Sequence, residues 1–260
     1  MQAFEIESKN VGDTLTVRVQ LPESYPFTEN NYPVLYVLDG DASFGLATSV
    51  MSYINLGANF GLGKNIPEMI VVSIGYERGG IPWLLTRVRD FTPTEDASFN
   101  YDNPNFVVPA SGKAEAFYKF ILEELNPSLN ELFRIDADRN VLATHSMGGV
   151  FAAYTLFKQT LAFKKVIMAC PFVGWDNRAV FKMQEDYAKT HKELKADIFL
   201  CVTGAEPTPP YIEEVNDFYK SLQASDYEGL NLTLAEYPQD NHFSVWAKAF
   251  IDGLAYVFNV

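Results

Sequence analysis

The sequence is poor in cysteine and histidine, with two cysteines and three histidines among 260 residues. Cys170 and Cys201 both lie inside apolar runs, where a buried thiol is more common than a disulfide or a metal ligand. Two thiols are also too few for a zinc site built from thiolates. We therefore expect no disulfide framework, no metal and no organic cofactor.

Positive charge is scarce as well. Twenty Lys and Arg stand against 33 Asp and Glu, and the net charge of −13 disfavours binding to nucleic acid or to an anionic membrane surface. No apolar run is long enough to cross a bilayer, and residues 1–7 lack the basic opening and the apolar run of a secretory signal. We expect a cytoplasmic protein whose partner is a small molecule, with neither nucleic acid nor membrane involved.

Apolar side chains make up 48% of the chain, enough to bury one core as a single domain over 1–260. Runs rich in β-branched and aromatic residues predict strands at 15–21, 34–38, 69–74, 140–144, 165–169, 198–202 and 230–234. Helical spacing predicts helices at 148–157, 177–192, 211–222 and 243–258, and another around 117–125 that ends before Pro127.

Strands and helices alternate from about residue 34 onward, which predicts an α/β fold with a mostly parallel, twisted sheet covered by helices on both faces. Residues 14–20 alternate between apolar and polar, a pattern typical of an antiparallel pair at the edge of a sheet. Segments 55–67 and 77–112 look like long structureless connections. Such loops are usually functional, so we expect a substrate-facing rim there.

The segment VLATHSMGGVF (141–151) carries the strongest chemical signal. A buried strand runs into a helix through Ser146, which two glycines follow, and a nucleophile elbow needs this context. In such a turn the Ser146 hydroxyl is exposed, and the Met147 N–H points at a developing oxyanion. Thr144 replaces the first glycine of the usual Gly-x-Ser-x-Gly pattern. The replacement implies altered packing beside the turn but removes no catalytic group.

A serine hydroxyl becomes a good nucleophile only when a base removes its proton, and histidine is the usual base. His145 belongs to the elbow and should point away from its neighbour Ser146, while His191 lies in a polar run. His242 follows the last predicted strand in YPQDNHF (237–243), where the chain order serine, acid, histidine places the base. We therefore predict His242 as the base.

The acid should follow a late strand and precede His242. Glu206, just after the strand at 198–202, is our choice, since a carboxylate there would orient the imidazole. Asp176, after the preceding strand, is a second candidate, and a serine and histidine working without an acid is a third possibility. For the second oxyanion donor, Gly40 would allow a close backbone approach after an early strand, and the N–H of Asp41 is the predicted donor.

Taken together, these segments resemble the putative esterase family of α/β hydrolases, and in particular its siderophore-esterase-like branch. PVLYVLDGD (33–41) resembles the early strand and oxyanion loop of that branch, and IPEMIVVSIGY (66–76) its next strand. RVRDFTP (87–93) is similar to its arginine-aspartate loop, and CPFVGWDN (170–177) to its serine-proline and tryptophan-aspartate-asparagine segment. Thr144, Cys170 and Gly174 depart from the family pattern.

The resemblance implies an α/β-hydrolase fold, with Ser146 as nucleophile, His242 as base and the N–H groups of Asp41 and Met147 as oxyanion hole. Arg87 and Arg89 could bind an anionic substrate such as a catecholate, or pair with Asp90 and fix the loop. The substrate contacts that we expect are Gly40, Arg87, Arg89, Trp175 and Asp176.

We therefore predict a serine carboxylester hydrolase that works through an acyl-enzyme on siderophore-type or other small esters. The alternatives are an acyl thioesterase or acyltransferase, and a catalytically silent hydrolase fold that binds a ligand.

Overall fold

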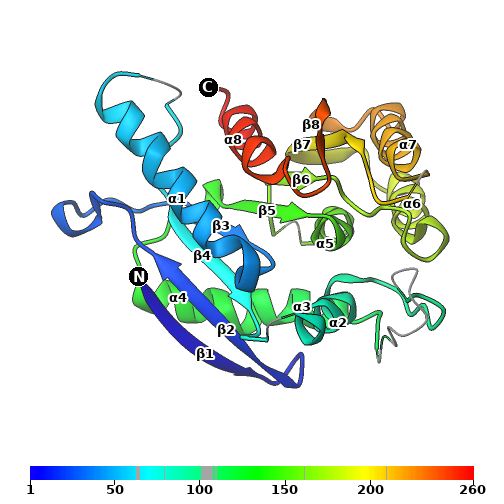
Figure 1. Cartoon of the computed structure of the whole chain (residues 1–260), viewed down its shortest axis with the longest axis horizontal. Helices are drawn as coiled ribbons and strands as arrows, with labels where there is room; N and C mark the ends of the chain where they lie inside the picture. The colour runs from blue at the N-terminus through cyan, green and yellow to red at the C-terminus, as the bar shows by residue number, and fades with distance from the viewer. Residues whose placement is uncertain (63–64, 79, 101–107, 109, 161, 209) are drawn as a thin grey trace.

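The computed structural model describes residues 1–260 except 63–64, 79, 101–107, 109, 161 and 209. In the described residues, eight strands form one sheet in the order β1-β2-β4-β3-β5-β6-β7-β8 (Figure 1). β2 pairs antiparallel with both β1 and β4, and all later neighbours are parallel. The strands are β1 (Gln2–Ser8), β2 (Asp13–Gln20), β3 (Val34–Val37), β4 (Ile70–Gly75), β5 (Val141–His145), β6 (Lys165–Ala169), β7 (Glu193–Ala205) and β8 (Glu228–Asn241).

Helices cover both faces of the sheet. Figure 1 shows α1 and α8 above the sheet in this view and α2 to α5 below it, and α1 also contacts α8. The helices are α1 (Gly40–Asn59), α2 (Ile81–Phe91), α3 (Ala114–Lys119), α4 (Asn126–Leu132), α5 (Met147–Leu156), α6 (Trp175–Ala188), α7 (Pro210–Ala224) and α8 (Trp246–Val257), with short 3₁₀ turns at Tyr25–Phe27 and Ala137–Arg139. Within the part of the chain described, no helix combines the length and the apolar character needed to span a membrane.

The architecture confirms the predicted α/β-hydrolase fold. β3, β5 and β6 lie in the middle of the sheet, which explains why their sequences are apolar on both faces. β7 and β8 extend well beyond the predicted ranges, because backbone hydrogen bonds between them continue through polar residues that carry no hydrophobic signal. β8, at the edge of the sheet, is half-buried or exposed at every position except Tyr237.

The helix that we expected to end before Pro127 continues past it. Residues Phe120–Leu125 form a π-helical turn that joins α3 to α4, and Pro127 lies in the first turn of α4. Proline removes one N–H and crowds the carbonyl of the preceding turn. In the widened turn the Asn126 N–H bonds to the Ile121 carbonyl, so the helix accommodates the proline ring without stopping.

The expectation that 77–112 lacks regular structure is wrong for its first part, which forms α2. Pro82 lies in the first turn of α2, where a missing N–H costs nothing, and Val88 and Phe91 are buried one helical turn apart. The expected structureless segment 55–67 likewise begins inside α1, whose last residue is Asn59. Helix α1 was not among the predicted helices.

Gly149 lies where α5 approaches the segment after β6 most closely. A methyl group added at Gly149 would stand 2.3 Å from Cβ and 2.6 Å from Cα of Pro171, and a proline ring cannot rotate away. We expect Gly149→Ala to lower the free energy of unfolding by about 1–3 kcal/mol, as other overpacked sites do. Urea denaturation measures the change.

The matched control is Gly45→Ala within α1, where an added Cβ meets nothing within 4 Å. Alanine there should raise the free energy of unfolding by about 0.4–1 kcal/mol. Equal effects of the two substitutions would contradict the proposed close packing at Gly149.

Candidate active site

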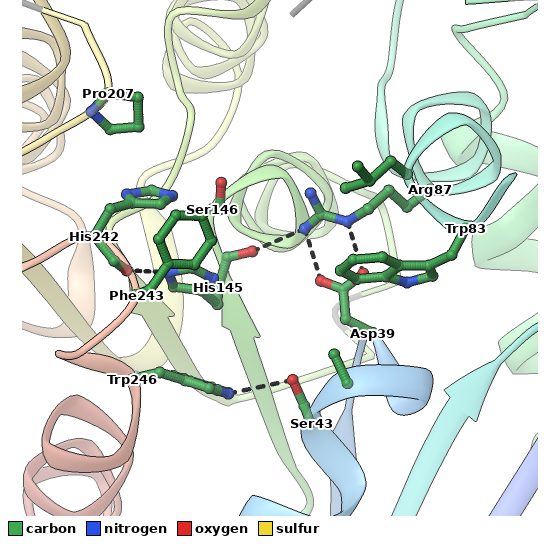
Figure 2. Close-up of a pocket in the computed structure, with 12 residues that line it drawn as sticks. Asp39, Ser43, Trp83, Arg87, His145, Ser146, Pro207, His242, Phe243 and Trp246 are labelled. Atoms are coloured by element: carbon green, nitrogen blue, oxygen red, sulfur yellow. Dashed lines mark hydrogen bonds and ion pairs between the residues drawn. The ribbon is translucent and has the colours of Figure 1, made fainter. Parts of the chain in front are cut away.

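Three strands of the parallel half of the sheet end directly before the residues predicted to carry the chemistry. β5 ends at His145, β7 at Ala205 and β8 at Asn241, so Ser146, Glu206 and His242 each occupy the next position. Parallel strands end at one edge of the sheet, where α/β proteins place their ligands. Ser146 and His242 line the same cavity at this edge (Figure 2).

Ser146 has the backbone conformation of a nucleophile elbow. Its φ is 57° and its ψ is −118°, a combination that costs a residue with a side chain about 1–3 kcal/mol. Two hydrogen bonds fix the turn, one to the end of β6 and one to the segment after it: the Ser146 N–H donates to the Ala169 carbonyl (2.9 Å), and the Phe172 N–H donates to the Ser146 carbonyl (3.0 Å). The structure therefore has the strand, sharp turn and helix that the sequence predicted.

Thr144 does not disturb this turn. Its buried side chain donates from Oγ1 to the carbonyl of Ile167 on β6 (2.9 Å), so the hydroxyl is satisfied within the sheet. The Thr144 Cβ lies 3.4 Å from the point where a Cβ of Gly148 would stand. The extra bulk at the first position of the pattern is thus accommodated against a glycine of α5, while Ser146 keeps its strained backbone.

Glu206 is the candidate acid that contacts His242. Its Oε2 lies 2.5 Å from Nδ1 of His242, and Oε1 accepts hydrogen bonds from the N–H (3.0 Å) and the hydroxyl (2.6 Å) of Thr203. Burial raises the pKa of Glu206, but the hydrogen bonds from His242 and Thr203 prevail and hold it at about 2. An ionised Glu206 requires the imidazole proton on Nδ1, which leaves Nε2 of His242 as a base. Asp176, the other candidate, lies in the first turn of α6.

His145 contacts both the backbone and the ring of His242. Its Nε2 lies 2.6 Å from the carbonyl oxygen of His242, and the centres of the two imidazole rings are 4.6 Å apart. Burial, together with the neighbouring His242, lowers the pKa of His145 to about 3. A neutral His145 therefore donates its Nε2 proton to the His242 backbone, away from the Ser146 hydroxyl, as the sequence analysis expected.

The first turn of α1 borders the site opposite His242. Asp39 adopts a left-handed conformation (φ 56°), and its carbonyl accepts the N–H groups of Ala42 and Ser43. A side chain at Gly40 would collide with the Ile74 backbone at 2.9 Å, which is why only glycine fits there. The Asp41 carboxylate accepts the Tyr76 N–H (2.8 Å). The Asp41 N–H, our predicted oxyanion donor, lies in this first turn. The N–H groups of a first helical turn have no carbonyl partner inside the helix.

The two arginines predicted to bind substrate project from α2 into separate ion pairs. Arg87 forms a buried bidentate pair with Asp39, with two N–O distances of 2.7 Å, and also donates to the His145 carbonyl (3.3 Å). Arg89 pairs with Asp90 (2.7 Å) and with Asp13 (2.9 Å). The alternative of a pair with Asp90 thus holds for Arg89 and is wrong for Arg87. Only Arg87 lines a cavity beside Ser146.

Two cavities meet at Ser146. The larger, of about 520 Å³, has Arg87 and His242 in its wall, and Trp246 at its base donates from Nε1 to Ser43 (3.2 Å), as Figure 2 shows. The smaller, of about 130 Å³, has three aromatic side chains in its wall. The larger cavity is lined by Asp39, Ala42, Ser43, Trp83, Leu84, Arg87, His145, Ser146, Pro207, His242, Phe243 and Trp246, and the smaller by Phe99, Ser146, Met147, Phe172, Pro207, Thr208 and Tyr211.

Several predicted contacts lie outside these walls. Trp175 is buried, donates from Nε1 to the Thr94 carbonyl (3.2 Å) and packs against Phe99; neither Trp175 nor Asp176 lines either cavity. The described residues of 55–67 are also absent from both walls, whereas segment 77–112 contributes Trp83, Leu84, Arg87 and Phe99. The sequence analysis missed Trp83, Trp246 and Tyr211. Only Trp246, four residues after His242, carried a positional signal.

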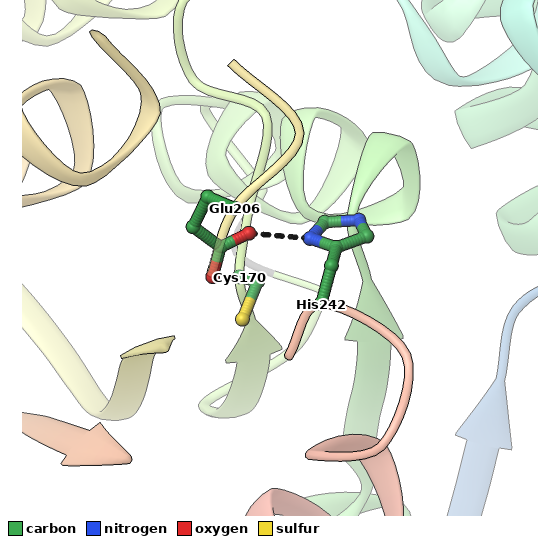
Figure 3. Close-up of side chains that lie close together, drawn as sticks. All are labelled: Cys170, Glu206 and His242. Carbon is green, nitrogen blue, oxygen red and sulfur yellow. Dashed lines mark hydrogen bonds and ion pairs between the residues drawn. The ribbon is translucent and has the colours of Figure 1, made fainter. Parts of the chain in front are cut away.

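Cys170, Glu206 and His242 form a cluster of residue types that bind metals, with one atom of each within 4.8 Å of the others (Figure 3). Cys201 lies 4.0 Å from the Cys170 sulfur. The interaction with Cys201, together with burial, raises the pKa of the Cys170 thiol far above its ordinary value, so the sulfur keeps its proton. Thiol ligation of a metal requires the thiolate. The chemistry of this cluster therefore fits a hydrogen-bonded group better than a metal site.

A strained serine at a strand-to-helix turn, beside a histidine that a carboxylate orients, defines the class of serine hydrolases with the α/β-hydrolase fold. Residues 8–257 match the family model described as "Putative esterase", and the chain belongs to this family of carboxylic ester hydrolases.

The chain is similar to several characterised or solved proteins. It is 26% identical over 245 residues to the ferri-bacillibactin esterase BesA of Bacillus subtilis, which covers 92% of this chain and 83% of the relative. The crystal structure of the BES protein of Bacillus cereus superposes with a TM-score of 0.86 at 27% identity, covering 98% of this chain and 95% of that one. An IroE-like serine hydrolase from Shewanella oneidensis gives a TM-score of 0.84 at 26% identity, covering 99% and 80%.

The buried pair of Arg87 and Asp39 predicts an asymmetric mutational response. Arg87→Met leaves the Asp39 carboxylate without its partner and should lower the free energy of unfolding by about 3–5 kcal/mol. The double variant Asp39→Asn, Arg87→Met leaves no lone charge and should lose clearly less. Urea denaturation of wild type, both single variants and the double variant gives the coupling.

Arg18→Met serves as the control, because the side chains of Arg18 and its partner Glu77 are 22% and 56% exposed. It should cost less than about 1 kcal/mol. Additive effects of Asp39→Asn and Arg87→Met would rule out the coupling.

His145 predicts a loss of stability in acid. Its folded pKa of about 3 lies below the ordinary 6.5, so between these values the unfolded chain binds one proton more than the folded chain. The contribution of His145 is complete above pH 6.5 and falls as the pH drops toward 3, by up to about 1.4 kcal/mol per pH unit. His145→Gln removes the titrating ring, so its free energy of unfolding should fall less steeply over pH 6.5–4.5. Denaturant titrations at each pH test this, with the exposed His191→Gln expected to follow wild type.

Proposed function

We propose that the protein hydrolyses ester bonds of siderophore-type substrates through an acyl-enzyme on Ser146. One observation carries the proposal: Ser146, strained and facing the larger cavity, shares that cavity with His242, whose Nδ1 is held at 2.5 Å by Glu206. A serine, a base and an orienting carboxylate are the groups that acyl transfer to a hydroxyl requires.

In the first half of the reaction, Nε2 of His242 removes the Ser146 proton as Oγ attacks the ester carbonyl carbon. The negative charge that develops on the carbonyl oxygen is stabilised by the N–H groups of Met147 and Asp41 at the starts of α5 and α1. Glu206 stays ionised and stabilises the imidazolium. The tetrahedral intermediate then collapses, the bond to the alcohol oxygen breaks, and His242 returns its proton to that oxygen.

In the second half, His242 removes a proton from water, and the hydroxide oxygen attacks the acyl carbon. The bond to Ser146 Oγ breaks, the carboxylic acid leaves, and the proton on His242 returns to Ser146. The smaller cavity contains Met147, so it suits the acyl group whose carbonyl oxygen faces the Met147 N–H. The larger cavity contains His242 and suits the alcohol that receives the proton.

Siderophore-type esters are proposed as substrates because named relatives act on them, BesA on ferri-bacillibactin and an Emericella nidulans relative, 24% identical over 296 residues, on enterobactin. Trp83, Phe243 and Trp246 give the larger cavity aromatic surfaces suited to flat aryl groups, beside the Arg87 guanidinium, whose charge Asp39 compensates. Residues 77–112 supply part of this wall and are proposed as the substrate-facing rim. We place the activity in the cytoplasm, where the free thiols of Cys170 and Cys201 persist.

A test compares wild type with Ser146→Ala, His242→Ala and Glu206→Gln on p-nitrophenyl butyrate and on a catecholate trilactone. Ser146→Ala and His242→Ala should each lower kcat by at least about 10³-fold, and Ser146→Ala should abolish labelling by a fluorophosphonate. Glu206→Gln should lower kcat less, because the imidazole keeps its place but loses the ionised partner. Asp176→Asn, a carboxylate outside both cavities, should leave kcat unchanged.

The results also separate the rival functions. Hydrolysis of acyl thioesters in preference to oxygen esters would favour a thioesterase, and acyl transfer to an added alcohol would favour an acyltransferase. Well-folded wild type that neither labels nor turns over any of these substrates would leave a binding protein built on a hydrolase fold.

A further inference from the structure

Thr203, near the end of β7, has a hydroxyl that the mechanism above does not use. Its side chain is buried, and Oγ1 donates to Oε1 of Glu206 (2.6 Å). The Thr203 N–H donates to the same oxygen (3.0 Å), so one carboxylate oxygen accepts two hydrogen bonds from a single residue. The other oxygen, Oε2, lies 2.5 Å from Nδ1 of His242. Thr203 therefore binds the acid through the oxygen that does not face the base.

The pairing of β7 with β8 joins the backbones that carry the acid and the base. The register of the two strands shifts between Thr203 and Ala205, as it does at a β-bulge. An added Cβ at Gly204 would stand 2.3 Å from the Pro238 carbonyl oxygen, so the strands approach closely at this shift. Beyond it the His242 N–H donates to the Ala205 carbonyl (3.2 Å). The pairing therefore fixes the backbone of the base beside the end of the strand that leads to the acid.

The side chain of Glu206 is then the part of the acid–base pair with the most freedom to turn. A glutamate has one more rotatable bond than an aspartate, so a fixed backbone alone does not fix the direction of its carboxylate. The carboxylate group is planar, so two donors on Oε1 also restrict where Oε2 points. The Glu206 side chain is only 1% exposed, so bulk water has little access to replace a missing donor.

The charge of Glu206 makes the Thr203 hydroxyl a one-way donor. Burial raises the pKa of Glu206, but the hydrogen bonds from His242 and Thr203 prevail and hold it at about 2. An ionised carboxylate only accepts hydrogen bonds, and bonds to a charged acceptor are the stronger kind. The hydroxyl proton of Thr203 therefore points at Oε1.

We propose that Thr203 is a positioning residue for the ester hydrolysis, whose hydroxyl holds the Glu206 carboxylate in the orientation that presents Oε2 to Nδ1 of His242. The proposal rests on the function proposed above. It places the effect of Thr203 on the base, through the acid, so substitution should slow the chemical step and leave substrate binding nearly unchanged. The hydroxyl carries this effect, and the bulk of the side chain does not.

The test compares Thr203→Val, which keeps the size and branching of the side chain and removes the hydroxyl, with Thr203→Ser, which keeps the hydroxyl and removes the methyl group. We expect Thr203→Val to lower kcat about tenfold with KM changed less than about twofold, in line with the loss of one hydrogen bond to a charged group. Thr203→Ser should keep kcat within about threefold of wild type. A packing role predicts the opposite order, because valine fills the site and serine does not. A Thr203→Ser that loses as much kcat as Thr203→Val would overturn the proposal.

A double variant shows whether Thr203 acts through Glu206. In a Glu206→Ala background, Thr203→Val should change kcat by less than about twofold, because the carboxylate that the hydroxyl holds is gone. A further tenfold loss in this background would contradict the proposed route through the acid.

Thr155→Val is the matched control. Thr155 is another buried threonine, its hydroxyl donates to the Ala152 carbonyl within α5 (2.8 Å), and it lies outside both cavities. It should lose comparable thermal stability while keeping kcat within about twofold of wild type. An equal loss of kcat in Thr155→Val and Thr203→Val would assign the effect to stability and overturn the positioning role.

All rates are referred to the amount of protein that a fluorophosphonate labels at completion, so a misfolded fraction cannot imitate the effect. The failure of this proposal and that of the proposed function are distinguishable. A wild type that neither labels nor turns over esters would refute the proposed function, whereas the outcomes above concern Thr203 in an active esterase.

Discussion

The strained backbone of Ser146 is the constraint on which the rest of the site depends. A serine keeps a φ of 57° only where the contacts around it hold the backbone in that strained conformation. Here the surroundings are Ala169 at the end of β6, whose carbonyl accepts the Ser146 N–H, and Phe172 beyond it, whose N–H donates to the Ser146 carbonyl. Helix α5 adds to them, because Gly149 has no side chain and lets the helix approach Pro171. β6 continues from this contact into Cys170, which faces both Tyr211 and Glu206. One segment after one strand therefore contacts the Ser146 turn, Glu206 and Tyr211.

Two histidines lie in contact at this edge, and their surroundings favour opposite roles. His145 is buried, has a pKa lowered to about 3 and directs its proton to the His242 backbone, so it remains a neutral support. His242 faces an ionised carboxylate through Nδ1 and a cavity through the rest of its ring. A charged His145 at a centre-to-centre distance of 4.6 Å would oppose the imidazolium that the proposed mechanism forms. A neutral His145 therefore adds no repulsion to the imidazolium that the proposed mechanism forms on His242.

The fold and the core of the site could be predicted from the sequence where the signal was local. β5, the turn and α5 are contiguous, so their apolar run, serine and glycines could be recognised together. Glu206 and His242 follow strand ends, and three histidines left few alternatives. Helix α2 was not predicted, since the polar residues on its exposed face resemble those of the loops around it. The pairing of Arg87 with Asp39, 48 residues apart, and the approach of Tyr211 to His242 are set by packing, and no short pattern records them.

The ion pair between Arg87 and Asp39 also bears on how the larger cavity would select a ligand. At a net charge of −13 the protein repels anions at long range, so an anionic substrate gains nothing from steering. Inside the cavity the guanidinium charge is already compensated by a carboxylate at 2.7 Å, so its net field is small. What remains to discriminate between ligands is the aromatic surface of Trp83, Phe243 and Trp246. The cavity is therefore better suited to flat aryl groups held by stacking than to small anions held by charge. Arg87 contributes more to the orientation of a bound ligand than to its affinity.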